Sequence, residues 1–578
     1  MASAIKKRGQ KIIRRFSRAS KKAGIESKEH IKENLLQRVS HIRNIRLLIV
    51  EWGLLVAALF MLALAQAFWF GDSYAENTFI DGGTYVEATV GRVNSMNPLF
   101  ATTSSEKALS KLMFATLTAV DYSGHPGPAL AESVTVGQDG KVWTVKLREG
   151  LKWSDGEPLT NADVIFTVDL IQSPAVNTIY EANLEGVRVG EDAAGNLVFS
   201  LTASYADFIS ALAIPIVPKH ILAEVPVKTL AEAPFSNAPI TSGAFSYNAM
   251  QVTGVEGESV YYLSPNPNYY LGEPMLSSFA VHTYADKEGV SQAINTGTVT
   301  ATAELSSPEA AALTTTAFEI RHTSINSGAF IFFNTNNSTL ASLPLRMALR
   351  QGIDLAALRE QAPGTVALDY PLLASQIELK NYPPIPAYDL AAARNAIQGI
   401  AAGQELRINI ATVDSGYLPA VATKLAEQLR LLGIESEVSV YPESQDFVTN
   451  VVSRRNYGIL LYEIELGSDP DPLAYFHSSQ AGAAGLNLAN YRNALVDDLL
   501  VGARETTDAT LRARKYETFL NYFVEDVPAI GLYQANLTYV YNRNVRAYGE
   551  QVRLVTGLDR FVDVTNWAAA KGMRNKTP

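Results

Sequence analysis

The sequence predicts a mixed α/β protein, of the α/β or α+β class, that is built from more than one lobe. At 578 residues the chain exceeds the roughly 250–300 residues at which a single hydrophobic core stops growing. Strand and helix patterns also alternate to the C-terminus, without the fixed period of about 20–50 residues that repeat proteins show.

The clearest predicted unit lies in the C-terminal half. Leu406–Thr412 (LRINIAT) has strand character, Leu418–Leu432 has the spacing of an amphipathic helix that ends at Gly433, and Ile434–Val440 is another strand. A helix between two strands is typical of parallel strand pairing.

A second predicted unit is a strand followed by a helix. Val142–Leu147 (VWTVKL) alternates as a strand, and Asn161–Ile171 (NADVIFTVDLI) has helical spacing with Asn161 as its expected cap. The folded part is expected to begin at Thr84, because residues 71–83 are polar and rich in glycine, as in a linker.

Charge and hydropathy separate the N-terminal region from the rest. Residues 1–46 hold 14 Lys/Arg against 3 Asp/Glu, and the remainder of the chain holds 34 against 55. The 24 residues of Leu47–Phe70 are largely apolar, and as a helix they reach about 36 Å, enough for a hydrocarbon core of about 30 Å. Because cationic flanks stay cytoplasmic, we expect a single-pass anchor in the cell membrane, a basic cytoplasmic tail and an extracytoplasmic remainder.

Two other interpretations of this region stay open. Ala65-Gln66-Ala67 has the small residues of a signal-peptide cleavage site, although the apolar region of a signal peptide is usually only about 7–15 residues long. The basic tail would also suit nucleic acid, but beside an apolar span it favours anionic lipid. We therefore expect membrane lipid as a partner, through the tail and Leu47–Phe70, and no nucleic acid.

The residue types that enzymes use form no catalytic pattern. The chain has no cysteine, which excludes disulfides, a lipid-attachment thiol and thiolate catalysis. Its seven histidines include no His-x-x-x-His pair, and it has no nucleophile elbow, phosphate loop or dinucleotide-binding glycine turn. The acidic pairs Asp469/Asp471 and Asp497/Asp498 suit turns better than a glycosidase site. We therefore expect that the protein is not an enzyme and that it has no cofactor and no metal site.

Ala131–Pro174 (AESVTVGQDGKVWTVKLREGLKWSDGEPLTNADVIFTVDLIQSP) closely resembles the signature stretch of the family 5 extracellular solute-binding proteins, the peptide and nickel binders of ABC importers. The resemblance covers roughly residues 84–541. Its further segments include TSGAFSY from Thr241, SPNPNYYLGEP from Ser264, FIFFNT from Phe330 and DPDPLAYF from Asp469.

The resemblance implies a two-lobe periplasmic-binding-protein-like fold, preceded here by one transmembrane helix, with two crossing strands between the lobes and an extra subdomain in the first. By analogy the chain divides into 1–46 (tail), 47–70 (anchor), 71–83 (linker), 84–110 and 215–283 (first lobe), 111–214 (its inserted subdomain), 284–529 (second lobe) and 530–578 (return to the first lobe and C-terminal tail).

The resemblance also implies a function. A protein of this family would capture oligopeptides or similar small solutes by hinge closure and deliver them to the permease subunits of an ABC importer. A chelated nickel ion is an alternative cargo. A receptor or scaffold of the same fold without a transport role is a second hypothesis, and an exported hydrolase is a third.

Glu463 and Glu465 are the first candidate ligand-binding residues. In peptide-binding relatives, an aspartate shortly before the segment that matches GSDPDP pairs with the α-ammonium group of the peptide, and an ungapped match places Leu466 there. In a strand, Glu463 and Glu465 would face the same way, so either carboxylate could bind a cationic group. The alternation equally suits two glutamates on a solvent face, with Ile464 and Leu466 inward.

The remaining candidates lie in or near segments that match edges of the family's cleft. They are Asn334 and Thr335 at the end of the FIFFNT strand, Asn94 and Ser95 in GRVNSMNP, and Tyr462 and Asp469 beside the glutamates. The amide and hydroxyl side chains could donate to backbone-like groups or cap local structure instead, and the aspartate could form a turn. The tyrosine offers apolar area and one hydrogen bond.

Overall fold

The computed structural model describes residues 50–66, 75–255, 257–442, 445–483, 485–549 and 551–575. One unit consists of residues 1–78 with 572–578, and the other of residues 79–571. Residues 50–66 form a helix with exposed side chains. Among the described residues, no helix combines the length and the hydropathy needed to cross a membrane. The basic tail, both ends of the predicted anchor and the start of the predicted linker lie outside the described residues.

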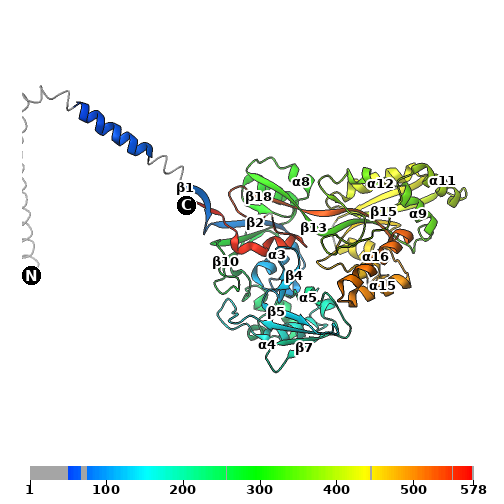
Figure 1. The fold of residues 1–578 in the computed structure, drawn as a ribbon, viewed down its shortest axis with the longest axis horizontal. Coiled ribbons are helices and arrows are strands. Elements are labelled where there is room, and N and C mark those ends of the chain that lie inside the picture. The colour runs from blue at the N-terminus through cyan, green and yellow to red at the C-terminus, as the bar shows by residue number, and fades with distance from the viewer. Residues whose placement is uncertain are drawn as a thin grey trace, which may run out of the picture. The chain divides into compact units, whose positions relative to one another are not determined.

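The unit of residues 79–571 is organised around a mixed sheet of eleven strands, of which Figure 1 labels β2, β10, β13, β15 and β18. Its order is β16-β15-β17-β13-β18-β12-β2-β11-β10-β9, and β14 pairs with β18 beside this path. The strands are β2 Thr84–Val90, β9 Phe245–Val252, β10 Ser259–Pro265, β11 Ser278–Tyr284, β12 Ala301–Thr302, β13 Phe318–Phe333, β14 Val366–Ala367, β15 Leu406–Val413, β16 Ile434–Tyr441, β17 Ile459–Glu465 and β18 Ala529–Asn542. A separate ribbon pairs β1 (Ala75–Ile80) with β19 (Ala570–Asn575).

The long antiparallel strands β13 and β18 join two hydrophobic cores. One core, which we call the second-lobe core, gathers buried residues between Ala329 and Tyr533. The other, the first-lobe core, gathers buried residues from 85–281 and 537–567, with Ala301. The β13–β18 register shifts between Ser324 and Gly328, so regular pairing is interrupted between the two cores.

The first lobe adds two small sheets and several helices to its half of the large sheet. One small sheet pairs β3 (Thr118–Val120) with β4 (Pro126–Pro128); the other has the order β5-β6-β8-β7, from Ala131–Val136, Val142–Leu147, Leu197–Ser200 and Arg188–Glu191. The helices are α3 Ser104–Met113, α4 Asn161–Ile171, α5 Phe208–Ala211, α6 Lys219–Leu222, α7 Lys287–Thr296 and α8 Ser307–Ala311, with short helical turns η2 Pro98–Phe100, η3 Glu181–Leu184, η4 Val227–Glu232, η5 Pro234–Ser236 and η8 Gly557–Asn566.

The predicted strand and helix of this lobe are confirmed as β6 and α4. The expected cap is wrong by one residue. Thr160 is the N-cap, because Asp163 stands three positions later and completes a capping box, in which the Thr160 N–H donates to Asp163 Oδ2 at 2.8 Å. Asn161 is therefore the first residue of the helix.

The second lobe contains the predicted strand-helix-strand unit. β15 and β16 pair in parallel from Leu406 and Ile434 onward, as the sequence predicts, and α12 (Leu418–Leu431) connects them. Gly433 has φ +83°, a left-handed conformation that ends the helix and that glycine adopts without steric cost.

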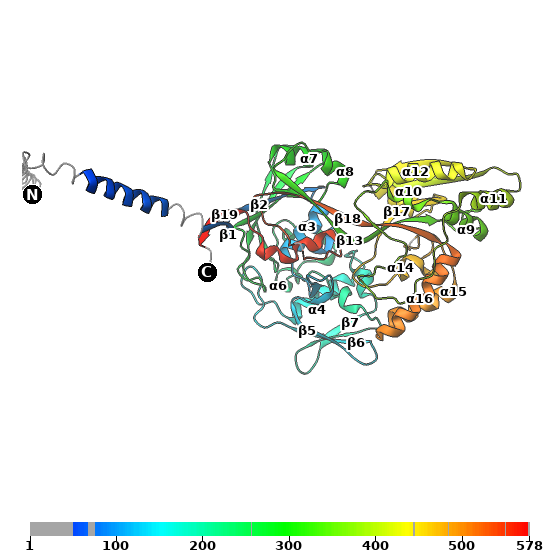
Figure 2. The same cartoon turned by 45° about the horizontal axis from the view of Figure 1, so that its top comes forward.

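Helices cover both sides of the second-lobe part of the sheet. In Figure 2, α12 and α10 lie on one side of β17, and α14, α15 and α16 lie on the other. The helices are α9 Leu343–Gly352, α10 Leu355–Arg359, α11 Leu390–Ala401, α13 Gln445–Phe447, α14 Leu473–Phe476, α15 Ala494–Glu505 and α16 Ala509–Asp526, with the short turns η6 Val448–Val452 and η7 Ser478–Gln480.

Candidate functional site

Two adjoining cavities lie between the lobes. Their volumes are about 540 Å³ and about 190 Å³. Both are lined by Ala303, Glu304 and Leu537, and each also receives a glutamate from β17 of the second lobe. They therefore adjoin each other beside β18, and we call the two together the interlobe cleft. Its size is in the range of ordinary small-ligand sites.

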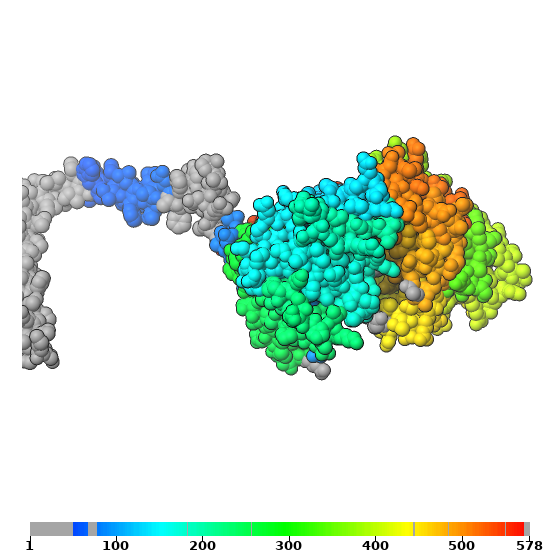
Figure 3. Space-filling view, turned by 90° about the horizontal axis from the view of Figure 1, so that it is seen from below, coloured from blue at the N-terminus to red at the C-terminus, as the bar shows by residue number. Residues whose placement is uncertain are grey.

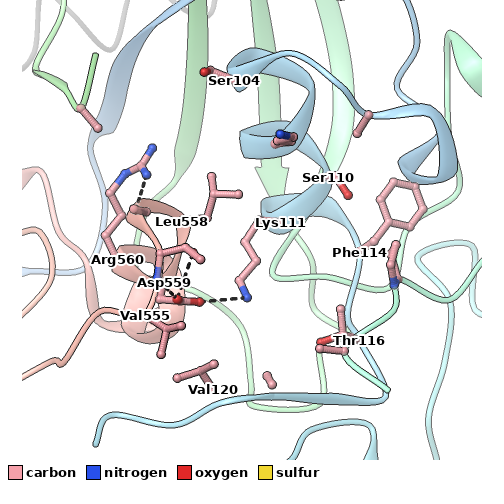
Figure 4. Close-up of a pocket in the computed structure, with 18 of the residues that line it drawn as sticks. Ser104, Ser110, Lys111, Phe114, Thr116, Val120, Val555, Leu558, Asp559 and Arg560 are labelled. Atoms are coloured by element: carbon pink, nitrogen blue, oxygen red, sulfur yellow. Dashed lines mark hydrogen bonds and ion pairs between the residues drawn. The ribbon is translucent and has the colours of Figure 1, made fainter. Parts of the chain in front are cut away.

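The first-lobe wall of the larger cavity is built from α3 and the start of η8. A capping box of Thr103 and Glu106 starts α3. Lys107 and Lys111 are four residues apart in this helix, so they share one face of it, and both line the cavity. Lys111 Nζ reaches toward Asp559 Oδ1 at 3.6 Å (Figure 4). Lys107 is exposed, which makes this end of the wall cationic.

A buried ion pair supports the same wall. Arg560 Nη2 lies 2.5 Å from Glu87 Oε1, and the two side chains are only 4% and 1% exposed. The Tyr539 hydroxyl donates to the other carboxylate oxygen of Glu87 at 3.2 Å. The charge of Arg560 is thus neutralised inside the protein, although the residue belongs to the cavity lining.

Glu304 is the carboxyl that both cavities share. Burial raises the pKa of Glu304 to about 7, an effect that Arg560 opposes and the charge of Glu87 reinforces. Burial destabilises the ionised form unless a cation approaches it. As a result, Glu304 gains or loses its charge near neutral pH.

Glu463 and Glu465 form the second-lobe wall. β17 alternates as the sequence predicts: Ile464 and Leu466 are buried, whereas Glu463 lines the smaller cavity and Glu465 the larger one. The Tyr533 hydroxyl donates to Glu463 Oε1 at 3.4 Å. The two glutamates therefore face the cleft from the same side of one strand, with Glu465 exposed at its end.

Tyr462 and Asp469 lie away from the two cavity linings. The Tyr462 ring packs 6.0 Å from the Phe447 ring on the second-lobe core. Both carboxylate oxygens of Asp469 accept from the guanidinium of Arg512, one of them at 2.6 Å. A ligand contact by Asp469 would have to compete with this ion pair.

Asn334 and Thr335 tie the end of β13 to neighbouring loops. The Asn334 amide donates to the carbonyls of Tyr457 at 2.9 Å and Arg455 at 3.2 Å. The Thr335 hydroxyl donates to the carbonyl of Ala489 at 3.0 Å. Neither side chain belongs to the lining of either cavity.

Asn94 and Ser95 wrap around the start of α3. Their backbone N–H groups donate to Glu106 Oε1 at 2.8 and 3.3 Å. Although burial opposes it, the backbone N–H groups of Thr103, Thr102 and Asn94 keep the pKa of Glu106 below its ordinary value. The segment thus fixes the helix that carries Lys107 and Lys111.

Sequence reasoning missed the first-lobe wall of the cleft. Lys111, Glu304, Asp559 and Arg560 stand in segments with no motif, and only the fold brings them together. The two lysines on one face of α3 were the single available signal, and it does not distinguish a cleft from a solvated surface. In the part of the chain that the structure describes, no group of three or more His, Asp or Glu side chains could hold a metal ion.

Comparison with known proteins places this geometry in a family. The model of the bacterial extracellular solute-binding proteins, family 5 Middle, matches residues 125–486. The oligopeptide-binding protein AppA of Bacillus subtilis is 24% identical over 493 residues, with 81% of this chain and 89% of that protein covered. Protein XP55 of Streptomyces lividans is 26% identical over 481 residues, with 77% of this chain and 83% of that protein covered.

Solved structures share the fold. AppA from Bacillus subtilis, in complex with a nonapeptide, has a TM-score of 0.70 at 22% identity and covers 85% of this chain and 100% of its own. NikZ from Campylobacter jejuni, in complex with Ni(L-His), has a TM-score of 0.70 at 24% identity, with 84% and 99% covered. The predicted mixed α/β, periplasmic-binding-protein-like fold is therefore confirmed. Since the family model spans more than half of the sequence, the chain belongs to the family 5 bacterial extracellular solute-binding proteins and is a binding protein, not an enzyme.

Proposed function

We propose that this protein captures peptides in the interlobe cleft by hinge closure and delivers them to the permease subunits of an ABC importer. The cleft itself carries the proposal, because Glu465 of the second lobe faces α3 of the first across a space of about 540 Å³. A ligand that contacts both walls stabilises the closed arrangement. The oligopeptide-binding name of AppA and the nonapeptide in its structure support peptides as the solute class.

The charges of the two walls suit a zwitterionic ligand. Glu465 is the proposed contact for a cationic group of the ligand, with Glu463 as the second carboxylate. Lys107 on the opposite wall suits a carboxylate of the ligand. The other predicted contacts are proposed as supports of the cleft, because their side chains are engaged within the protein or lie outside its lining: Tyr462, Asp469, Asn334, Thr335, Asn94 and Ser95.

We further propose that Leu47–Phe70 anchors the protein in the cell membrane, with residues 1–46 in the cytoplasm and the binding unit outside. The apolar length of 24 residues and the excess of 14 Lys/Arg over 3 Asp/Glu before it support this topology. Both the tail and the anchor would contact membrane lipid.

The division into lobes at residues 84–283, 284–529 and 530–578, with a subdomain at 111–214, is likewise a proposal. The second-lobe core ends at Tyr533, which supports the boundary near 530. Its first buried residue is Ala329, whereas Tyr284 and Val290 pack with Ala88 of β2. We therefore propose that the boundary expected near 284 lies nearer Ala329, which leaves α7, α8 and Glu304 with the first lobe.

Thermal unfolding of the purified full chain in detergent, with pools of dipeptides to nonapeptides, tests the proposed function. A ligand at 100 times its Kd stabilises the native state by about 2.7 kcal/mol, which should raise Tm by roughly a few degrees. Free amino acids serve as the matched control, and a nickel–histidine complex tests the alternative cargo. No shift with any peptide pool would contradict peptide capture, and a shift with the nickel complex alone would replace it.

A further inference from the structure

A second contact between the lobes lies outside the interlobe cleft. Residues 204–210, before and within α5 of the first lobe, meet residues 468–471 and the facing ends of α15 and α16 in the second. Ala206 N–H donates to the Arg504 carbonyl at 2.9 Å, and the Ser204 hydroxyl donates to the Glu505 carbonyl at 2.8 Å. The Ser210 and Ser468 hydroxyls lie 2.9 Å apart. Figure 3 shows the cyan-to-teal surface of the first lobe against the orange surface of α15 and α16.

Aromatic and charged side chains complete this contact. The Arg504 guanidinium lies 5.5 Å above the Tyr205 ring, and its Nε donates to Asp471 Oδ2 at 2.6 Å. Asp469 is bound by Arg512. The second lobe therefore presents two arginines and two aspartates, already paired with one another, to the first.

Asp207 is the one carboxyl that the first lobe adds to this set. It is only 7% exposed and stands at the N-cap position of α5. The groups that act on it are Asp469, Asp471 and Arg512 of the second lobe and Ser210 of its own helix. Because both arginines already have carboxylate partners, an ionised Asp207 would be a third negative charge beside them.

We propose that the contacts of residues 204–210 with residues 468–471 and with Arg504 and Arg512 form a latch that holds the lobes closed, and that Asp207 makes this latch sensitive to pH. This inference rests on the proposed hinge closure, and it adds a closing contact outside the lining of the interlobe cleft. Asp207 is a positioning residue, since it acts on the cleft only through the distance between the lobes.

The sign of the pH effect follows from the environment of Asp207. Burial, followed by the charge of Asp469, raises the pKa of Asp207 to about 8 in the latched state, whereas a solvated aspartate has a pKa of about 3.9. Closing therefore takes up a proton between these two values. The latch is strongest at acid pH, weakens as pH rises toward 8, and changes little above that.

Amide hydrogen exchange on the ligand-free full chain measures the latch directly. The protection of the Ala206 N–H reports contact with Arg504, and the Leu212 N–H, which donates to Phe208 within the α5 turn, reports local folding. Relative to Leu212, protection at Ala206 should fall at least ten-fold between pH 6 and pH 8, once intrinsic exchange rates are divided out. Asp207→Asn, which imitates the protonated form, should remove this fall and be at least ten-fold more protected than the parent at pH 8.

Two further variants keep the test decisive. Asp139→Asn removes an exposed carboxylate from the β5–β6 turn of the same lobe and should keep the parental pH profile. Ser468→Ala should lower protection at every pH and leave the slope unchanged. The proposal is overturned if parent and Asp207→Asn share one pH profile, or if Ala206 is unprotected at every pH while Leu212 is protected. Since no ligand is present, this outcome is independent of the peptide screen.

Discussion

The two walls of the interlobe cleft differ in how firmly their charges are fixed. On the first-lobe wall, Arg560 is paired with buried Glu87 and Lys111 approaches Asp559. On the second-lobe wall, Glu465 is exposed at the end of a strand and forms no ion pair with another described residue, while Glu463 accepts a hydrogen bond from Tyr533. The first wall pairs Arg560 and Lys111 with carboxylates of its own and leaves Lys107 exposed, whereas the second keeps carboxylate capacity for a ligand.

Substitutions that remove a charge should therefore have different effects on the two walls. Removing a paired charge from the first wall should act on folding, because its partner is left buried without compensation. Removing one from the second wall should act on binding, because an exposed carboxylate contributes little to stability.

The largest expected effect is on Arg560. Arg560→Met leaves Glu87 buried without its cation and should lower the free energy of unfolding by about 3–5 kcal/mol, as measured by urea denaturation. The double variant Glu87→Gln/Arg560→Met should recover most of this loss, because no unpaired charge remains. A loss below about 1 kcal/mol for the single variant would show that the pair does not support the wall.

The next effect concerns Glu304 and depends on pH. Its pKa of about 7 in the folded protein exceeds the value of about 4.3 in an unfolded chain, so its ionisation destabilises the native state as pH rises from about 4 to about 7. Glu304→Gln should therefore stabilise the protein relative to the parent by about 2 kcal/mol more at pH 8 than at pH 5. Urea denaturation at both pH values measures this difference, and an equal effect at both would place Glu304 in a solvated environment.

A smaller effect is expected from Glu465. Glu465→Gln should weaken binding of a peptide found in the stability screen by about ten-fold, or about 1.4 kcal/mol, and change the unfolding free energy by less than about 0.5 kcal/mol. Isothermal titration calorimetry measures the affinity. Glu437→Gln, which removes an exposed strand glutamate of β16 outside both cavities, is the matched control. Equal affinities of the two variants would remove Glu465 from the site.

The smallest effect is expected at Lys111. Its side chain is 29% exposed and lies 3.6 Å from Asp559, so Lys111→Gln should lower the unfolding free energy by about 0.5 kcal/mol. Addition of salt should reduce the difference between variant and parent. A loss close to that of Arg560→Met would mean that the outer pair of the wall is as important as the inner one.

Local patterns predicted the elements, and the fold alone determined their partners. β15, α12 and β16 follow from apolar spacing within a few residues, and so does the outward direction of Glu463 and Glu465 on β17. Glu87 and Arg560, by contrast, are 473 positions apart, and the sequence around each residue does not predict their ion pair. Periodicity reports which face of an element is buried, but a partner so distant is selected by strand order and lobe packing.

The same limit explains the other predicted contacts. Asn334 and Thr335 end a strand that the resemblance places at the cleft edge, yet whether their side chains face a ligand or a neighbouring loop depends on residues 455–457 and 489–490. The sequence allowed Asp469 to be either a ligand contact or a turn-forming residue. Its pairing with Arg512 depends on α16 packing beside the turn.

The distance between the lobes, with and without peptide, tests capture by closure most directly. The chain has no cysteine, so single cysteines at exposed Val136 of the first lobe and Leu431 of the second can carry a specific pair of spin labels for a pulsed dipolar measurement. At pH 8, where the proposed latch is weakest, a saturating peptide from the stability screen should convert a broad distance distribution into one narrow population. The same labels on Glu465→Gln should need about ten times more peptide to do so. Identical distributions with and without a peptide that binds would contradict hinge closure as the means of capture.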